Sequence, residues 1–220
     1  MIRLSYHISK LILRLFFTFR FGLRVTGQEH VPKRGPFILA SNHISFLDPP
    51  LLGGACPRRL RFLARADLFE RPVLGAYLRS VGVMPLRRGE TDVAAMRAAL
   101  AALKRGEAVA IFPEGHRQDS GQLSSAKRGV GLLAAAARVP IIPVLVQGTY
   151  EALPPEAARL QPAKIRVAFG PPISYTSGSS PAGPPDAMPP MEGQERGRAR
   201  HEQLAEAVTQ SWRRLQEQRT

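Results

Sequence analysis

The stretch PFILASNHISFLDPP, residues 36–50, decides how the rest of the chain is interpreted. It opens with an apolar run, residues 36–40, that is typical of a short buried strand. It closes with two prolines, which no strand interior tolerates. His43 and Asp48 therefore lie where a strand ends, and in α/β proteins ligands bind beyond the carboxyl ends of the strands.

The five-residue spacing of His43 and Asp48 limits how the two side chains can meet. On a regular helix they would be ~140° apart, but across a turn they can touch. Because proline disfavours a helical conformation in the preceding residue, we expect Asp48 to be extended, with Pro49 beginning a helix that runs to about Cys56. Such a pair can fix the imidazole tautomer of a general base. The simpler alternative is that Asp48 caps this helix and His43 is an ordinary loop histidine.

Length and composition favour one large domain, or one domain with appendages, with a substantial core. A chain of 220 residues can bury ~70% of its unfolded surface. Cys56 is the only cysteine, so the sequence predicts no disulfide framework and no zinc site, as in a reducing compartment. We expect no metal and no resident cofactor.

The net charge of +14 predicts an acidic partner, whether nucleic acid, an anionic membrane or a phosphorylated substrate. The charge is clustered: residues 1–34 hold seven basic side chains and one acidic one, and residues 57–88 hold eight and two. The chain lacks the basic strand with interleaved aromatic residues that is typical of RNA-binding proteins, so no nucleic-acid partner is expected.

Residues 3–21 are predicted to form an amphipathic helix at a membrane surface. The charge-free stretches are shorter than the ~20 residues that a spanning helix needs, and no cleavage site of a secretory signal follows. The alternative is a core-packing helix with a solvated basic face. The expected apolar face comprises Leu4, Ile8, Leu11, Ile12, Leu15, Phe16 and Phe19, and the basic face comprises Arg3, His7, Lys10 and Arg14.

Strands and helices alternate along the rest of the chain, which predicts right-handed crossovers. The predicted fold class is α/β: a largely parallel mixed sheet flanked by helices, with an N-terminal amphipathic membrane-surface helix. Expected strands cover residues 21–26, 36–40, 59–64, 81–86, 107–112, 141–147 and 165–169. Expected helices cover residues 49–56 and 72–79, a segment from Thr91 to Gly106, and residues 127–138.

Four parts of the chain are distinguished by composition. Residues 1–22 are the membrane-associating helix, and residues 23–173 the α/β domain. Residues 174–196, rich in Pro, Gly, Ser and Met, are expected to be a disordered linker. Residues 197–220 are expected to form a C-terminal amphipathic helix that docks back onto the domain or onto a membrane.

Two more predicted strands end in polar residues: Arg87-Arg88, and Glu114-Gly115-His116-Arg117. If these strands run parallel in one sheet, their ends share an edge with His43, and a candidate base lies beside guanidiniums that suit a phosphate. Gly115 allows backbone N–H groups to approach an anion or oxyanion, as amides near Asn42 also could. The alternative is that the arginines are surface charges and that Glu114 pairs with Arg117 in an ordinary turn.

Together these segments resemble the four ordered motifs of the glycerolipid acyltransferases, specifically the 1-acylglycerol-3-phosphate acyltransferases. The resemblance spans about residues 36–147. The four segments are Asn42-His43-x-Ser45-x-x-Asp48, Gly82-Val83-Met84-Pro85-Leu86-Arg87-Arg88, Phe112-Pro113-Glu114-Gly115-His116-Arg117 and Val139-Pro140-Ile141-Ile142-Pro143.

The resemblance implies roles for single residues. His43 would deprotonate the acceptor hydroxyl and Asp48 would orient it, while Ser45 is expected in a turn or cap and not as a nucleophile. The fourth motif is apolar and looks structural, and it would line the site with Ile141, Ile142 and Pro143. Binding of the acceptor's glycerol phosphate is implied for Arg88, Glu114, Gly115, Arg117, the neighbouring Arg87 and Lys127. His116 stands where the family usually has Thr or Ser, and Arg87 where an acidic residue is common.

The reaction implied is acyl transfer from acyl-CoA or acyl carrier protein to the sn-2 hydroxyl of 1-acylglycerol-3-phosphate (lysophosphatidic acid), giving phosphatidic acid in phospholipid synthesis. The thioester is a cosubstrate, and the expected location is the cytoplasmic face of an anionic membrane. Three alternatives stay open: acylation of another lysolipid or of glycerol phosphate, hydrolysis with water as acceptor, and a non-catalytic basic protein that binds anionic membranes or nucleic acid.

Overall fold

A computed structural model describes residues 2–86, 92–175 and 193–218 of the chain. The helices are α1 (Ile2–Phe21), α2 (Asp48–Ala55), α3 (Pro72–Val81), α4 (Asp92–Lys104), α5 (Gly129–Ala137), α6 (Thr149–Ala152) and α7 (Gly193–Glu217). The strands are β1 (Arg24–Thr26), β2 (Ile38–Ser41), β3 (Leu60–Arg61), β4 (Leu63–Arg65), β5 (Met84–Leu86), β6 (Ala108–Ile111), β7 (Ile141–Gln147) and β8 (Arg166–Phe169).

Six strands form the main sheet, in the order β1-β8-β7-β2-β6-β3. Strands β7, β2, β6 and β3 run parallel, whereas β8 runs antiparallel to β7 and carries β1 parallel to itself. The mostly parallel α/β sheet flanked by helices is therefore confirmed. All four residues of β2 are buried between its two neighbours, as expected of a continuous apolar run in a parallel sheet. The chain leaves β2 for His43 at the carboxyl edge of this sheet.

The predicted strands 59–64 and 81–86 were both expected in the main sheet, but they do not both lie there. The first is divided into β3 and β4, and β4 pairs with β5 in a separate two-stranded sheet. After Arg61 the chain no longer pairs with β6, because its next polar groups pair with the β5 segment. Phe62 O accepts from Met84 N at 2.8 Å, and the Arg61 guanidinium donates to Gly82 O at 2.9 Å.

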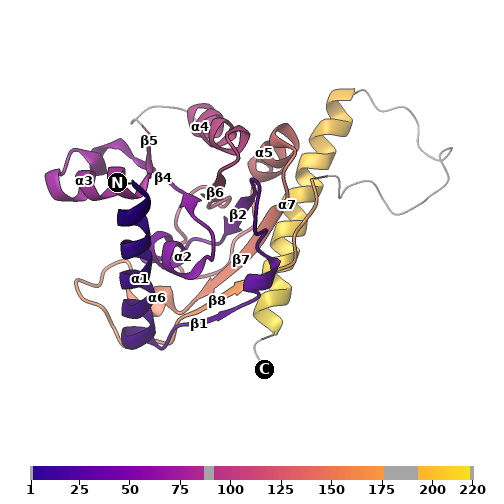
Figure 1. Cartoon of the computed structure of the whole chain (residues 1–220). Helices are drawn as coiled ribbons and strands as arrows, with labels where there is room; N and C mark the ends of the chain where they lie inside the picture. Colours follow the sequence, from indigo (N-terminus) through magenta and orange to yellow (C-terminus); the bar gives the residue numbers. More distant parts are fainter. Residues whose placement is uncertain (1, 87–91, 176–192, 219–220) are drawn as a thin grey trace.

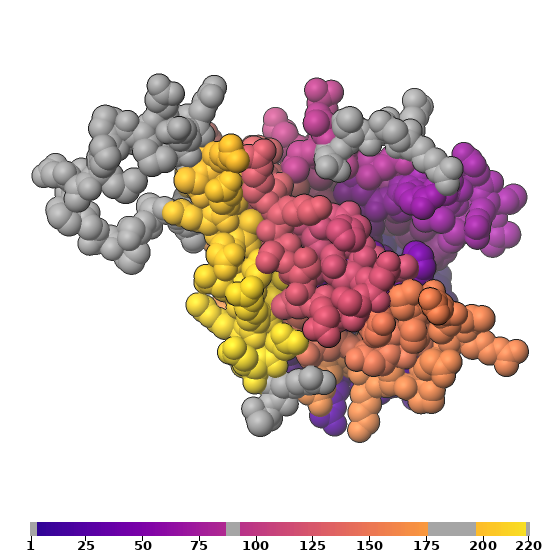
Figure 2. Space-filling model, turned by 180° about the vertical axis from the view of Figure 1, so that it is seen from behind, coloured from indigo at the N-terminus to yellow at the C-terminus, as the bar shows by residue number. Residues whose placement is uncertain are grey.

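Helices cover both faces of the main sheet (Figure 1). Helices α1 and α2 bury one face, and α4, α5 and α7 bury the other. Figure 2 shows α7 lying along α5 on the far side of the molecule from α1. The Trp212 indole of α7 is fully buried and donates to Ala40 O of β2 at 3.2 Å. The C-terminal helix was expected to dock either onto the domain or onto a membrane, and in the structure it docks onto the domain.

Helix α7 begins at Gly193, inside the stretch that was expected to be a linker up to residue 196. Residues 176–192, which make up most of that predicted linker, lie outside the described residues.

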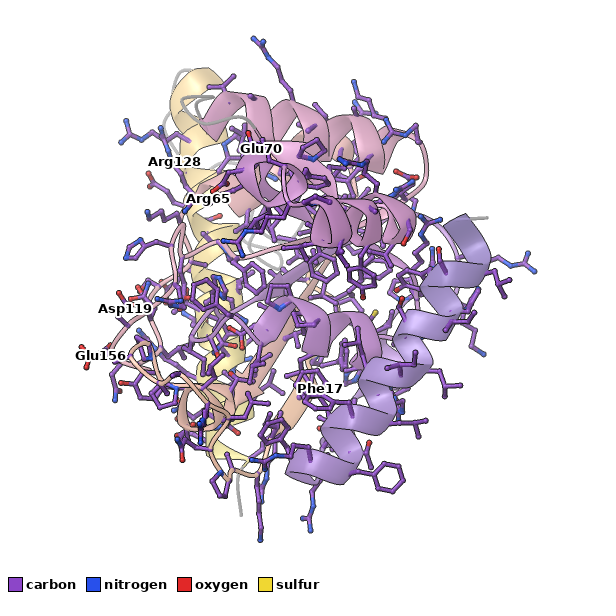
Figure 3. All side chains as sticks on the ribbon, turned by 90° about the vertical axis from the view of Figure 1, so that its left-hand side faces the viewer. Phe17, Arg65, Glu70, Asp119, Arg128 and Glu156 are labelled. Atoms are coloured by element: carbon purple, nitrogen blue, oxygen red, sulfur yellow. The ribbon has the colours of Figure 1, made fainter. Side chains whose placement is uncertain are left out.

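Helix α1 packs on the domain through a face that the sequence pattern did not single out. Tyr6, Phe17 and Phe21 are buried, and Phe17 points from α1 into the molecule (Figure 3). Gly54 of α2 allows the close approach, since a Cβ there would lie 3.1 Å from the backbone N of Arg14. The expected apolar face is exposed instead, and we call it the α1 stripe: Leu4, Ile8, Leu11, Ile12, Leu15, Phe16 and Phe19.

The core-packing alternative therefore holds for one side of α1 and leaves a second apolar side in solvent. Among the described residues, no helix has a long enough uncharged apolar run to cross a bilayer.

Candidate active site

The loop after β2 brings His43 and Asp48 into contact. His43 Nδ1 lies 2.9 Å from Asp48 Oδ2, and the exposed fractions of the two side chains are 19% and 0%. Helix α2 begins at Asp48 itself, so the prediction that this residue is extended before Pro49 was wrong. Asp48 N donates to Ser45 O at 3.2 Å, and the bonds to its carboxylate outweigh the modest preference that a following proline imposes.

The Asp48 carboxylate is held by four hydrogen bonds. Oδ2 accepts from His43 and from the backbone N–H groups of Ile44 and Ser45, each at 2.8 Å. Oδ1 accepts from the Thr149 hydroxyl at 2.6 Å. These bonds also explain why Asp48 does not act as an ordinary helix cap: its carboxylate points back into the preceding loop, where it closes the turn that carries His43.

Thr149 is a functional candidate that the sequence analysis missed. It is fully buried and is the first residue of α6, directly after Gly148, which has a φ of 85°. The Gly-Thr pair after a buried strand signals a turn into a helix. Nothing in that signal indicates that the hydroxyl reaches a carboxylate 101 positions earlier, because only the pairing of β7 with β2 brings the two together.

The hydrogen bonds determine which nitrogen of His43 can act as a base. An ionised carboxylate only accepts, so Nδ1 must carry the proton in the His43–Asp48 bond. The neutral ring then presents its lone pair at Nε2. The ring stacks on Phe112, with centroids 4.1 Å apart and planes inclined by 24°. The imidazole is thus fixed by one hydrogen bond and one aromatic contact.

Glu114 positions this loop from the neighbouring strand end. Its side chain is buried, and its two oxygens accept from His43 N at 2.8 Å and from Ser124 N at 3.0 Å. Burial raises the pKa of the carboxyl group, and the two backbone N–H groups oppose that shift. With both oxygens bound to backbone N–H groups, Glu114 holds the loop in place, and its implied part in binding the acceptor phosphate stays a prediction. The considered pairing of Glu114 with Arg117 is not formed, since Arg117 pairs with Asp119.

The loop after β6 supplies two cations. Arg117 lies 3.0 Å from Asp119 Oδ1, and its guanidinium lies over the Phe46 ring at 4.1 Å. Gly115 has a φ of 88°, and a Cβ there would lie 2.6 Å from Lys127 Nζ. Glycine at this position therefore leaves room for the Lys127 side chain to extend across the loop.

The predicted arginines 87 and 88 lie outside the described residues. The strand that leads to them ends at Leu86, which is paired with Arg65 of β4. Arg65 is therefore a further cation at that strand end, one that the sequence analysis did not select. It currently binds Asp67 at 2.8 Å.

Two backbone N–H groups that could hold an oxyanion lie in the Gly115 loop. The amides after Asn42 are occupied, since those of residues 43, 44 and 45 all donate to carboxylates. The Asn42 side chain is equally occupied, accepting from Val146 N at 2.7 Å and donating to Val146 O at 3.0 Å. Within the described part of the chain, the N–H groups of His116 and Arg117 donate to no protein group.

Other polar candidates near the site are structural. Ser45 is buried, accepts from Leu47 N at 3.3 Å and donates to Leu153 O at 3.4 Å, in agreement with its expected place in a turn. Cys56 is fully buried, and burial raises the pKa of its thiol to about 11, so it stays neutral and unreactive. No group of His, Cys, Asp and Glu side chains able to hold a metal ion occurs among the described residues.

The fourth motif does not line the site, although the resemblance implied that it would. Ile141 and Ile142 begin β7, and Ile141 is paired with Ile38 at the start of β2. They lie at the opposite end of these strands from His43. Both are fully buried and pack in the two cores of the domain.

Comparison with known proteins identifies a matching family and several relatives. The family model described as Acyltransferase matches residues 22–147. The chain is 31% identical over 137 residues to the chloroplastic 1-acyl-sn-glycerol-3-phosphate acyltransferase of Arabidopsis thaliana, covering 61% of this chain and 38% of that protein. It is 28% identical over 137 residues to the 1-acyl-sn-glycerol-3-phosphate acyltransferase of Bacillus subtilis, covering 62% and 68%.

Two further matches extend this comparison. The lyso-ornithine lipid O-acyltransferase of Pseudomonas aeruginosa is 31% identical over 144 residues, covering 65% of this chain and 54% of that protein. The crystal structure of the 1-acyl-sn-glycerophosphate acyltransferase of Thermotoga maritima has the same fold, with a TM-score of 0.70, 24% identity and coverage of 95% of this chain and 78% of that one. The chain thus spans little more than a third of the Arabidopsis relative and most of the Thermotoga structure.

Proposed function

The chain belongs to the acyltransferase family, and we propose that it transfers a fatty acyl group from a thioester to the sn-2 hydroxyl of 1-acylglycerol-3-phosphate, giving phosphatidic acid. The observation that carries the proposal is the contact between His43 and Asp48 at the carboxyl edge of the sheet. Relatives named 1-acyl-sn-glycerol-3-phosphate acyltransferase support the choice of acceptor.

In the proposed mechanism, His43 Nε2 accepts the proton of the acceptor hydroxyl as its oxygen attacks the thioester carbonyl. Asp48 stabilises the imidazolium that forms, through the bond to Nδ1. The tetrahedral oxyanion would be held by the N–H groups of His116 and Arg117. Collapse of this intermediate releases the thiolate, which takes the proton back from Nε2. The acyl group passes directly to the acceptor, so no enzyme nucleophile is needed.

The acceptor phosphate is proposed to bind Arg117 and Lys127 together with arginines 87 and 88. Arg117 and Lys127 flank the Gly115 loop, and arginines 87 and 88 follow β5 in the sequence. Guanidinium groups bind phosphate through two parallel hydrogen bonds, and an ammonium contributes a point charge. Because this group is cationic, a phosphate-bearing lysolipid is preferred over a neutral one.

The α1 stripe is proposed to rest in the surface of an anionic membrane. Seven large apolar side chains are exposed on it, and α1 carries basic side chains without an acidic one. A helix of this composition lies in the interface with its apolar face among the lipid headgroups. The proposed location is the cytoplasmic face, where acyl-CoA and acyl carrier protein are supplied.

A second acceptor deserves a direct comparison, because one relative is named a lyso-ornithine lipid O-acyltransferase. Lyso-ornithine lipid lacks a phosphate; its carboxylate can bind a guanidinium but carries less negative charge. We rank lysophosphatidic acid first for this reason.

An acceptor panel tests the proposal. The purified chain is given acyl-CoA or acyl carrier protein thioester with lysophosphatidic acid, lyso-ornithine lipid, glycerol 3-phosphate or no acceptor, and products are identified by mass spectrometry. Phosphatidic acid is expected as the main product. Thioester cleavage of equal rate without any acceptor would indicate a hydrolase, and exclusive acylation of lyso-ornithine lipid would overturn the assigned substrate.

A further inference from the structure

Helix α3 leaves two large apolar side chains in solvent next to α1. Val73 is 85% exposed and Tyr77 is 40% exposed. Ser80 follows them on the same face, since these three positions fall within ~60° of one another on a helix. Ser80 O accepts from the Ser5 hydroxyl of α1 at 2.8 Å. The C-terminal end of α3, where this exposed face ends, therefore contacts α1.

The point of contact on α1 joins this face to the α1 stripe. At ~100° per residue, Ser5 lies at the border between the stripe and the packed side of α1. Leu4 and Ile8, the stripe residues nearest to it in the sequence, are both at least half exposed. Figures 1 and 3 show α3 lying against the N-terminal half of α1. The two helices thus present neighbouring apolar surfaces.

The charges around this combined surface suit an anionic partner. Neither α1 nor α3 contains an acidic residue. Exposed basic side chains lie on both helices: Arg14 and Arg20 on α1, and Arg79 near the end of α3, whose guanidinium donates to Phe69 O. Basic side chains beside exposed apolar ones favour a bilayer with anionic lipids, which takes up both kinds of group.

We propose that α3 is a second membrane-contacting element, whose Val73 and Tyr77 enter the headgroup region together with the α1 stripe. The proposal rests on the proposed function in taking a lipid surface as the partner. A single interfacial helix can roll about its own axis, whereas two non-collinear contacts define a plane. Tyr77 suits the boundary, because its ring is apolar and its hydroxyl stays hydrated. Helix α3 then fixes the orientation of the active site relative to the plane of the bilayer.

The test compares two valine-to-aspartate variants of the full chain. Val73→Asp places a charge in the proposed contact. Val93→Asp is the matched control: Val93 is 53% exposed in the first turn of α4, on the other face of the sheet. In both variants the aspartate lies in the first turn of a helix, where it is tolerated equally well. Binding is measured by co-flotation with phosphatidylcholine vesicles that contain or lack phosphatidylglycerol.

Val73→Asp is expected to lower the partition coefficient on the anionic vesicles about tenfold or more, since it removes an apolar side chain that the bilayer would bury and adds a repelled charge. Val93→Asp should bind as the parent chain does. Equal binding of all three proteins would overturn the proposal. So would a dimer in lipid-free solution that Val73→Asp dissociates while vesicle binding stays unchanged, because the face would then bind a second copy.

Acyl transfer to a short-chain lysophosphatidic acid, dispersed below its micelle concentration, is measured in parallel. This acceptor needs no vesicle, so Val73→Asp should retain the parent rate. Absence of transfer in the parent chain would refute the proposed function and leave the vesicle result to decide the role of α3.

Discussion

Replacing Thr149 with valine isolates one hydrogen bond of the site. Valine has nearly the same shape as threonine, so the change removes the hydroxyl that donates to Asp48 Oδ1 at 2.6 Å and little else. Both side chains are fully buried, and no other described residue donates to that oxygen. A buried acceptor left without a partner costs ~1–3 kcal/mol, and more when it is charged.

This cost predicts effects on both stability and catalysis. For a chain of this size, 1 kcal/mol corresponds to ~2–4 °C in the melting temperature, so Thr149→Val should melt roughly 3–10 °C lower. The carboxylate also loses the contact that fixes its rotation, and the imidazole follows it. A misplacement of this kind is expected to lower kcat roughly 10–100-fold with little change in the KM for the acceptor, because Thr149 contacts no substrate.

The assay is steady-state transfer to lysophosphatidic acid, combined with a thermal melt of each variant. Thr149→Ser keeps the hydroxyl and serves as the matched control, so it should recover most of the parent kcat. A purely structural role would lower the folded fraction and leave kcat per folded molecule unchanged. If Thr149→Val retained the parent kcat after that correction, or if Thr149→Ser were equally impaired, the assigned role would be refuted.

Three further changes test other parts of the site. Gly115→Ala should lose at least tenfold in activity, because the new Cβ would meet the neighbouring lysine ammonium; Gly106→Ala has a similar φ but open space around it and should lose only stability. Asp119→Asn should lower the KM for lysophosphatidic acid by up to ~5-fold in low salt, because it frees the Arg117 guanidinium from an exposed ion pair; an unchanged KM would contradict this competition. Burial raises the pKa of Cys56 from 9.0 to about 11, so its stabilising contribution is complete below pH 9 and lost between pH 9 and 11. Between pH 8 and pH 10.5 the free energy of unfolding, measured with urea, should therefore fall less in Cys56→Ala than in the parent chain. Equal falls in the two proteins would contradict the burial effect.

The contact between His43 and Asp48 could be predicted from the sequence, because a strand, a turn and a proline pair within fifteen residues restrict the chain locally. The conformation of Asp48 could not. The pre-proline preference is local and modest, whereas Asp48 is held by a hydroxyl that arrives from the end of β7. Contacts between distant strand ends are set by sheet order, which strand patterns do not reveal.

Sheet membership shows the same limit. The apolar runs at 59–64 and 81–86 predicted strands, and short strands are present in both. Periodicity indicates that a strand forms, but its partner depends on where the chain turns after Arg61. Likewise the pattern of α1 predicted an apolar face and a basic face, and missed that Tyr6, Phe17 and Phe21 form a second apolar side. Because these aromatic residues stand among basic ones in the sequence, the helical pattern did not show them as a separate apolar face.

The family's motifs correctly indicated that the loops after β2 and β6 meet, but not what each side chain does there. Glu114 was grouped with the phosphate-binding residues because the Glu-Gly-x-Arg motif that it matches is associated, in the family, with the acceptor's glycerol phosphate. In the structure its oxygens accept from backbone N–H groups of two loops. Burial distinguishes the two roles, and burial of a single carboxylate in a loop is not visible in sequence.

The central claim is that His43 Nε2 accepts the proton of a lipid hydroxyl. The most direct measurement is the rate of CoA release that depends on lysophosphatidic acid, in the parent chain and in His43→Ala, with circular dichroism and vesicle binding as measures of an intact fold. A positioned general base contributes ~10²–10⁴ in rate, so His43→Ala should lose at least a hundredfold while fold and vesicle binding are retained. A folded His43→Ala protein that transfers acyl groups within tenfold of the parent rate would contradict the claim.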